Sequence, residues 1–434
     1  MNLAIWKGAS NNWPRLRLKH ACRFIGGGTP DKGNEGYWSG KIPWVSPKDM
    51  KSDVIRDTED HISEEGLQKS ATRLVGPGAV LVVMRSGILR HSVPVGVNAI
   101  PVALNQDMRA MIPDERIEPR YLARLIEGHQ AELLRAWSKE GTTVESLESD
   151  LLGETEVPVP PRFQQCAIAD FLDQETQTID ALVRAKERVL NLLAEKRQGL
   201  IIQAVTRGLN PNVPLRDSGL RWLGKIPKHW TTERLRFFLT VLEQGWSPQA
   251  EERVPENGAW GVLKLNSVNR GVFDRTKAKA LPPGLTIQPN LEIRPLDFLV
   301  TRANTPELVG DVCFVTESAP RLILCDLIYR LRLKEKRING AFLNYFLLSP
   351  TGRIQIAADA RGSSNSMVKI SQEHIKNWWI PVPPLTEQAA IVTHVLTETA
   401  KLDALRAATE RTISLLKERR AALIAAAVTG QIEV

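Results

Sequence analysis

Two long stretches of the chain carry apolar residues at intervals of three, four and seven positions. In the first stretch the intervals are 4, 7, 3, 7, 4 and 7, at Ile168, Leu172, Ile179, Leu182, Val189, Leu193 and Leu200. Between residues 164 and 206 there is no proline and one glycine, Gly199. These intervals place side chains on one stripe of an α-helix, so the pattern predicts a single long helix over 164–206.

The second stretch repeats the first 223 residues later, counted from Pro158 to Pro381. The sequence Pro-Val-Pro-Pro opens each stretch, at 158–161 and 381–384. Proline is tolerated in the first turn of a helix but not in its interior, so the motif marks a helix start and predicts a second helix over 387–429. Identical residues keep this spacing at Gln165/Gln388, Ile168/Ile391, Asp180/Asp403, Arg197/Arg420 and Thr206/Thr429.

A helix of about forty residues is about 60 Å long, and an apolar stripe along it needs a partner. The other copy is the obvious candidate, and the chain order favours an antiparallel pair related by a pseudo-twofold axis. The alternative is that each helix packs only on its own domain. The predicted coiled-coil or subunit interface comprises Ile168, Leu172, Ile179, Leu182, Leu193, Leu200, Ile391, Val395, Leu402, Leu405, Leu416 and Leu423.

The segments before the two helices have a mixed pattern. Short β-branched runs predict strands at 80–84, 298–301, 312–315 and 328–333, and apolar spacing predicts helical segments at 121–137 and 341–358. We therefore predict an α+β protein, in which two α/β domains are joined by two long helices that form an antiparallel coiled coil with an internal pseudo-twofold repeat. The predicted boundaries are 1–157 for the first domain, 158–208 for the first helical region, 209–229 for a linker, 230–380 for the second domain and 381–434 for the second helical region.

Composition adds a modest bias towards nucleic acid. The 434 residues are 43% hydrophobic and 24% charged, as in ordinary globular proteins, and the formal net charge of +8 permits contact with phosphates. The apolar runs are too short to cross a bilayer, so we expect no membrane partner and a cytoplasmic location. The four cysteines are scattered without metal-ligand spacing and are expected to be reduced thiols, at Cys22, Cys166, Cys313 and Cys325.

Signatures of catalysis are absent from the sequence. It has no phosphate-binding G-x-x-x-x-G-K-[ST], no G-x-S-x-G and no paired histidines with metal-ligand spacing. We therefore assign no catalytic residue and no metal ligand, although an enzyme with an unfamiliar site stays open.

Basic and amide side chains instead follow the predicted strands. Arginine and lysine suit guanine edges and phosphates, and asparagine suits adenine. Arg85 and Arg302 each follow a strand and enter a loop, where binding residues are commonly found, and we interpret them as matched positions. The candidate DNA-binding residues are Lys48, Arg85, Ser86, Arg90, Lys264, Asn266, Arg302 and Asn304.

Several motifs in order resemble one family, the specificity (S) subunit of type I restriction-modification systems. They are the loop 27–30 (Gly-Gly-Thr-Pro) with the following 37–46, Arg85-Ser86-Gly87, the motif Pro-x-Pro-Pro-x-x-x-Gln at 158–165 and 381–388, and the junction 218–230. The second half departs from the first, since Gly245-Trp246-Ser247-Pro248 and Arg302-Ala303-Asn304 replace the corresponding motifs.

The resemblance implies a bacterial or archaeal DNA-recognition subunit without a catalytic site. Its two domains would be target-recognition domains that each read half of a split site in double-stranded DNA. The paired helices would set the spacer and dock two methyltransferase (modification) subunits, which restriction (helicase-nuclease) subunits join. S-adenosylmethionine, ATP and magnesium would belong to those partners, with no cofactor in this chain.

Two rivals stay open at this point. One is a stand-alone DNA methyltransferase or nuclease with an unrecognised active site. The other is a coiled-coil assembly protein that has no role with nucleic acid.

Overall fold

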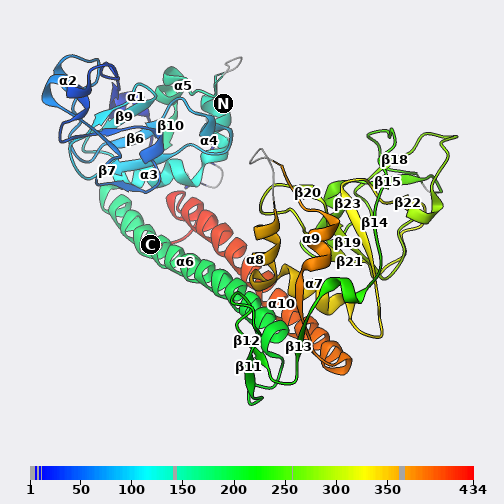
Figure 1. Ribbon diagram of the computed structural model, residues 1–434. Coiled ribbons are helices and arrows are strands. Elements are labelled where there is room, and N and C mark those ends of the chain that lie inside the picture. The colour runs from blue at the N-terminus through cyan, green and yellow to red at the C-terminus, as the bar shows by residue number, and fades with distance from the viewer. Residues whose placement is uncertain (1–4, 7–8, 11, 140–143, 257, 361–366) are drawn as a thin grey trace. The chain divides into compact units, whose positions relative to one another are not determined.

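A computed structural model describes residues 5–6, 9–10, 12–139, 144–256, 258–360 and 367–434 (Figure 1). The chain forms two compact units. Unit 1 comprises Met1–Arg188 and Glu410–Val434, and unit 2 comprises Val189–Thr409. Both long helices pass from one unit into the other, so each unit contains a part of each helix.

The elements of unit 1 alternate short strands with short helices. In chain order they are β1 (Arg15–Arg17), α1 (Leu18–Ala21), β2 (Cys22–Gly26), η2 (Glu35–Trp38), β3 (Ile42–Val45), η3 (Pro47–Asp49), β4 (Val54–Ile55), β5 (Asp60–Ile62), α2 (Glu64–Gln68), β6 (Val80–Val83), η4 (Gly87–Arg90), β7 (Val95–Asn98), β8 (Ala103–Leu104), β9 (Met108–Pro113), α3 (Pro119–Gly128), α4 (Gln130–Trp137), α5 (Ser149–Glu154), β10 (Glu156–Pro158) and the long helix α6 (Arg162–Arg207), which continues into unit 2.

Unit 2 follows the same plan. Its further elements are β11 (Leu215–Asp217), β12 (Lys225–Pro227), β13 (Thr231–Arg234), η5 (Leu235–Phe238), β14 (Leu239–Gln244), β15 (Gly261–Leu263), η6 (Leu265–Ser267), β16 (Val268–Asn269), β17 (Val272–Phe273), β18 (Ala278–Ala280), η7 (Pro289–Leu291), β19 (Asp297–Thr301), β20 (Ala303–Asn304), β21 (Val312–Phe314), β22 (Leu322–Ile323), β23 (Ile328–Leu333), α7 (Gly340–Leu348), α8 (Pro350–Asp359), β24 (Val368–Lys369), α9 (Gln372–Asn377), β25 (Trp379–Val382) and the long helix α10 (Leu385–Val428), which continues into unit 1.

The strand pairings show that the two units share one fold. The main sheet has the order β2-β9-β6-β7-β4 in unit 1 and β14-β23-β19-β21 in unit 2. A smaller sheet has the order β5-β3-β8 in one and β18-β15-β22 in the other, and its first pair is antiparallel and its second parallel in both. The repeat that the helices revealed in the sequence therefore extends to the main sheet and the smaller sheet of each unit.

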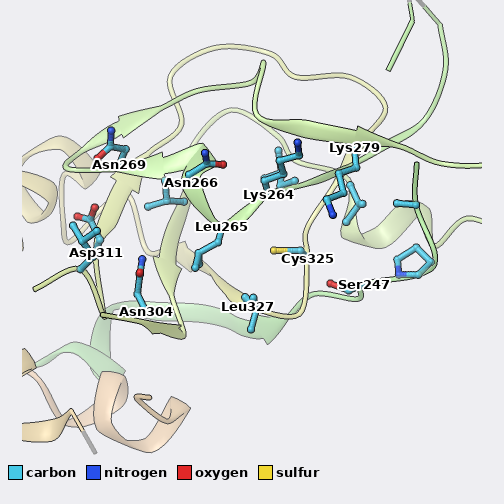
Figure 2. Close-up of a pocket in the computed structure, with 16 residues that line it drawn as sticks. Ser247, Lys264, Leu265, Asn266, Asn269, Lys279, Asn304, Asp311, Cys325 and Leu327 are labelled. Atoms are coloured by element: carbon cyan, nitrogen blue, oxygen red, sulfur yellow. The ribbon is translucent and has the colours of Figure 1, made fainter. Parts of the chain in front are cut away.

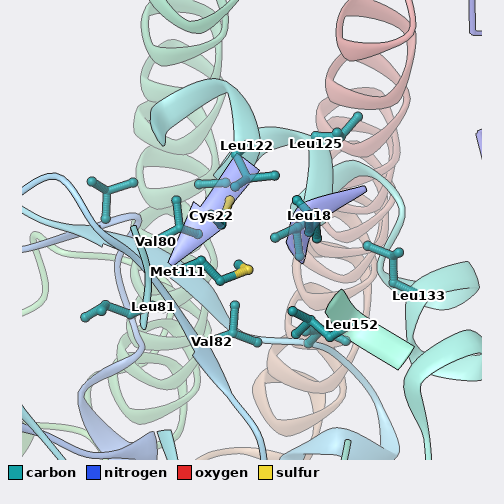
Figure 3. Packing of buried hydrophobic residues seen from close by; sticks show 14 of the residues in the cluster. Leu18, Cys22, Val80, Leu81, Val82, Met111, Leu122, Leu125, Leu133 and Leu152 are labelled. Atoms are coloured by element: carbon teal, nitrogen blue, oxygen red, sulfur yellow. The ribbon is translucent and has the colours of Figure 1, made fainter. Parts of the chain in front are cut away.

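The main sheet of unit 1 is covered on both faces. All four residues of β6 are buried, which explains why this strand reads as a continuous apolar run rather than an alternating one. Figure 3 shows Val80 and Met111 of the sheet in one cluster with Leu122 of α3 and with Leu18.

Each predicted helical segment before a long helix is divided into two helices. His129 has a non-helical conformation (φ −127°, ψ 30°) and separates α3 from α4. Ser349 separates α7 from α8, because its side chain accepts a hydrogen bond from the N–H of Gly352 while Pro350 has no N–H to continue α7. Apolar spacing carries no sign of either break.

The two long helices run antiparallel, as predicted. In unit 1, Arg420 of α10 lies 3.0 Å from Asp180 of α6. In unit 2, Arg197 of α6 lies 2.7 Å from Asp403 of α10. Because Asp180/Asp403 and Arg197/Arg420 are equivalent in the repeat, the two ion pairs are one contact made once in each unit, and the predicted antiparallel pairing is confirmed.

Each helix also packs into a domain core, so the two alternatives for their packing are both partly realised. Ile168 and Leu172 of α6 are buried in unit 1 with Ile424 and Val428 of α10. Unit 2 repeats this arrangement with Ile391 and Val395 of α10 and with Ala204 and Val205 of α6.

The buried stripe differs from the predicted seam at one step. It continues through Thr176 and Thr399, whose hydroxyls donate to the carbonyl oxygens of Leu172 and Val395, four residues earlier, at 2.6 and 2.7 Å. The stripe then passes through Ile179 and Leu402, which are buried, whereas Leu182 and Leu405 are 47% and 56% exposed. As seam residues Leu182 and Leu405 are wrong, and in α6 the buried stripe continues instead at Val183, one position after Leu182. The predicted residues Leu193, Leu200, Leu416 and Leu423 are half-buried.

A buried glutamine explains the motif that precedes both helices. The side-chain oxygen of Gln165 accepts from the N–H of Glu118 at 2.8 Å, and its amide donates to the carbonyl oxygens of Arg116 and Pro160 at 2.9 and 2.8 Å. In unit 2 the oxygen of Gln388 accepts from the N–H of Asn339 at 2.7 Å, and its amide donates to the carbonyls of Pro383 and Arg337. Each glutamine thus ties the start of a long helix to the turn before α3 or α7.

The glycines of the predicted recognition loops lie against a strand. A Cβ atom on Gly27 would lie 1.9 Å from the carbonyl oxygen of Asn105, and one on Gly245 would lie 2.3 Å from that of Cys325. The residue after each glycine forms a backbone hydrogen bond with the same segment. The N–H of Gly28 donates to the carbonyl oxygen of Leu104 at 2.8 Å, and the N–H of Trp246 donates to that of Leu324 at 2.9 Å. The two loops are therefore equivalent, and glycine is needed where the backbones meet.

We expect Gln165→Leu to lower the free energy of unfolding by about 2–4 kcal/mol, because it leaves buried peptide groups without partners. Urea denaturation of the full chain, followed by circular dichroism, measures the loss. Gln177→Leu, at an exposed position of the same helix, is the control. Equal stability of the two variants would contradict a role for the glutamine.

Gly27→Ala should destabilise the chain by about 1–3 kcal/mol, because the added methyl group meets the backbone of the neighbouring strand. Its neighbour provides a matched control, since a Cβ on Gly26 would meet nothing within 4 Å. Gly26→Ala should keep or slightly raise the midpoint of thermal unfolding. The interpretation fails if both variants melt alike.

Candidate nucleic-acid interface

The edge of the smaller sheet gathers polar side chains in unit 2. The turn after β15 carries Lys264 and Asn266, and β20 ends in Asn304. These three predicted residues line one cleft of about 630 Å³. Figure 2 shows their side chains around the same opening.

The cleft has further polar residues that sequence reasoning missed. Ser247, Asn269 and Lys279 also line it. Lys279 lies on β18, where the antiparallel register places it opposite Val262 of β15. The sequence signal for Ser247 was present in the loop motif, but the approach of Lys279 depends on strand pairing across the intervening loop.

A buried carboxyl group anchors one end of the cleft. Asp311 lines the cleft, and its carboxylate accepts hydrogen bonds from the backbone N–H groups of Arg270 and Val312, at 2.6 and 2.9 Å. Burial raises the pKa of Asp311, and the two N–H groups oppose that effect. Asp311 thereby holds the turn between β16 and β17, next to Asn269, in place.

Unit 1 uses different side chains on the same scaffold. Lys48, after β3, forms ion pairs with Asp60 at 2.8 Å and with Glu59 at 3.3 Å, and the hydrogen bond to Asp60 raises its pKa. A smaller cleft of about 250 Å³ is lined by Lys32, Trp38, Trp44 and Asp60. The two indole rings meet edge to face, with their centroids 5.0 Å apart.

The strand register matches these positions between the units. Trp44 is paired with Asp60 on β5, as Val262 is paired with Lys279 on β18. The indole of unit 1 therefore stands where unit 2 has a smaller valine, and an acid stands where unit 2 has a lysine. The two surfaces differ in shape and charge although their backbones correspond.

The interpretation of Arg85 and Arg302 as matched positions is wrong. The N–H of Met84 donates to the backbone carbonyl of Asp107, and the carbonyl of Met84 accepts from the N–H of Leu147. In unit 2 the N–H of Arg302 donates to the carbonyl of Leu327, and the carbonyl of Arg302 accepts from the N–H of Ile370. Arg302 thus corresponds to Met84, and Ser86 corresponds to Asn304. A shift of one residue in extended backbone turns a side chain to the other face, and sequence spacing cannot detect it.

The remaining candidates lie near these positions. Arg85 is exposed and Arg302 is half-buried. Arg90 forms an ion pair with Glu145 at 3.1 Å, and the hydroxyl of Ser86 accepts from the N–H of Ile88 at the start of η4. Ser86 therefore has a local structural role as well as its predicted one.

Two negative observations apply to the described part of the chain. No group of three or more histidine, cysteine, aspartate or glutamate side chains there is arranged to hold a metal ion. Nor does any helix among those residues combine the length and the apolar character that a membrane span requires.

Comparison with known proteins matches this architecture to one family. A family profile described as the type I restriction modification DNA specificity domain matches residues 11–191. The chain is 36% identical over 171 residues to the specificity subunit of the type I restriction enzyme EcoR124I/EcoR124II of Escherichia coli, covering 39% of this chain and 42% of that protein. It is 28% identical over 277 residues to the MjaIX specificity subunit of Methanocaldococcus jannaschii, covering 60% and 59%. The chain thus spans less than two thirds of the length of these relatives.

Two solved structures share the fold over nearly the whole chain. A chain from a structure of a type I restriction-modification system, solved to explain its assembly and conformational transition, has a TM-score of 0.70 at 17% identity and covers 98% of this chain and 99% of its own. The HsdS subunit of Thermoanaerobacter tengcongensis has a TM-score of 0.55 at 15% identity and covers 98% of both chains. Residues 11–191 thus match the type I restriction modification DNA specificity domain, and the chain as a whole shares the fold of these two solved structures.

Proposed function

We propose that this chain is the DNA-reading subunit of a type I restriction-modification complex and has no catalytic site of its own. The observation that carries the proposal is one scaffold built twice with different side chains at corresponding positions. Trp44 and Asp60 of unit 1 are replaced by Val262 and Lys279 in unit 2. Such a pair suits a target with two unlike halves, because base readout depends on side chains while the scaffold only positions them.

The helices α6 and α10 are the proposed spacer and docking surface. Leu182 and Leu405 are equivalent in the repeat and exposed in both copies, so each offers an apolar contact to a partner. Under this proposal two methyltransferase subunits, which carry S-adenosylmethionine, dock on the helices of a bacterial or archaeal chain. Restriction subunits that use ATP and magnesium then join the complex.

Incubation of the purified chain alone with DNA, magnesium and S-adenosylmethionine separates this proposal from an enzyme with an unrecognised site. We expect neither methylation nor cleavage until the partner subunits are added. Turnover by the chain alone would overturn the proposal. Sequence-selective retention of DNA by the chain with its methyltransferase would exclude a purely structural coiled coil.

Arg85→Ala should relax recognition of one half-site while leaving the other unchanged. If the guanidinium contacts one guanine through two hydrogen bonds, the loss is about 1–3 kcal/mol at one base pair. Sequencing of methylated sites in host DNA that carries the variant system measures the change. An equal loss on every sequence would mark Arg85 as a phosphate contact instead.

Deletion of seven residues from each long helix should shorten the preferred spacer between half-sites. Seven residues span about 10 Å of helix, which corresponds to about three base pairs. A methylation assay over duplexes of graded spacer length gives the preferred gap. An unchanged gap in a folded variant would contradict the spacer role.

A further inference from the structure

In unit 2 two lysines of the cleft share one glutamate. The ammonium of Lys264 lies 3.6 Å from one carboxylate oxygen of Glu252, and the ammonium of Lys279 forms a hydrogen-bonded ion pair with the other. The side chain of Glu252 is 75% exposed, so water reaches the carboxylate freely.

The sheet explains why the two lysines meet. Lys279 pairs with Val262, and the N–H of Lys264 donates to the carbonyl of Lys277, so the antiparallel register continues to that residue. Lys264 and Lys279 therefore point to the same face of the β15–β18 pair, as diagonal neighbours. Figure 2 shows both side chains on one side of the cleft.

Unit 1 repeats the arrangement with different residues. Glu59 lies 3.3 Å from the ammonium of Lys48, which also pairs with Asp60 at 2.8 Å, and 3.2 Å from that of Lys51. Lys48 occupies the third position after β3, where the turn after β15 has Asn266. Because the lysines of the two units are not equivalent positions, the shared feature is the arrangement itself: one exposed glutamate held by two lysines beside the recognition turn.

We propose that Glu59 and Glu252 each occupy the place of a DNA phosphate in the free protein, and that a backbone phosphodiester replaces the carboxylate when DNA binds. The proposal rests on the proposed DNA-reading function. It assigns Lys48 with Lys51, and Lys264 with Lys279, to the DNA backbone, and leaves base readout to other side chains of each unit.

Three physical points support the exchange. A carboxylate and a phosphodiester are both oxyanions that suit a pair of ammonium groups. An exposed ion pair contributes little to stability, so the carboxylate is readily displaced. Hydrogen bonds from the lysines lower the pKa of both glutamates, and the largest effect comes from Lys51 on Glu59 and from Lys279 on Glu252. Both carboxylates are therefore ionised at neutral pH and can compete with a phosphate.

The test compares Glu59→Gln and Glu252→Gln with the wild-type full chain, each assembled with its methyltransferase subunits. The probe is a mixed-sequence DNA duplex, and fluorescence anisotropy over a series of potassium chloride concentrations gives Kd. Each variant should bind about two- to fivefold more tightly, because its lysine pair has lost a competitor. The gain should be the smaller for Glu59→Gln, because Asp60 still holds Lys48. The logarithm of affinity should also fall more steeply with the logarithm of salt concentration, by up to about one in slope. In the wild-type chain the displaced carboxylate takes up a cation and offsets part of the ion release, whereas the glutamine does not.

Glu317→Gln is the matched control, since it removes the same charge from an exposed position of unit 2. It should change affinity by less than about 1.5-fold, because screening weakens charges at a distance. In a Lys279→Gln background the gain from Glu252→Gln should shrink, which links the effect to the lysine pair.

The outcomes separate the two proposals. Unchanged or weaker binding by Glu252→Gln, with wild-type complex retained on DNA, would show that the glutamate only orients the lysines and would overturn the exchange alone. A gain confined to one DNA sequence would also overturn it, because phosphate contacts do not depend on the bases. Failure of the wild-type complex to bind any duplex would overturn the DNA-reading function and the exchange together.

Discussion

Each unit closes its core with a helix end that comes from the other half of the sequence repeat. In unit 1 the hydroxyl of Tyr121 donates to the carbonyl oxygens of Pro158 and Val428, and so joins the domain to α10. Ala427 and Val428 are fully buried there, as Val205 of α6 is in unit 2. Buried apolar surface stabilises by about 25 cal/mol per Å², so the exchanged helix end contributes to the stability of each core. This exchange requires the two long helices to run antiparallel.

The charged contacts of the helix α3 in unit 1 are not repeated by its counterpart α7 in unit 2. In unit 1 Arg124, with a side chain only 7% exposed, binds Asp53, Glu127 and Asp173 at 2.6 to 2.8 Å. A buried guanidinium is stable only with its partners in place, so this region of unit 1 tolerates little change. The corresponding residue of unit 2 is Tyr345, whose ring packs beside the apolar core. The correspondence follows from the helix starts, because Arg124 lies six positions after Glu118 and Tyr345 lies six positions after Asn339. The repeat therefore keeps the buried glutamines, which satisfy backbone groups, while other contacts have diverged.

The recognition surfaces combine conserved backbone geometry with divergent chemistry. The glycine loops, the turns after β3 and β15 and the parallel strand β8 or β22 are common to both units. On that framework the cleft of unit 1 is lined by Trp38, the buried Trp44, a lysine and an acid, and that of unit 2 by lysines and amides. Much of the positive charge at these turns is already paired with carboxylates, so under the proposed function each surface would meet DNA with competing anions in place. That arrangement favours discrimination between ligands over indiscriminate attraction to polyanions.

The sequence by itself predicted the long helices, their antiparallel pairing, the strands at 80–84, 298–301, 312–315 and 328–333, and the resemblance to one family. These features depend on local periodicity and on repetition along the chain, both of which can be read in one dimension. Only the tertiary structure decided that Thr176 rather than an apolar residue continues the buried stripe, that Arg302 corresponds to Met84, and that Lys279 meets Lys264 across one glutamate. Each of these depends on which backbone groups pair across long loops, and a one-residue difference in register reverses the face of every side chain involved.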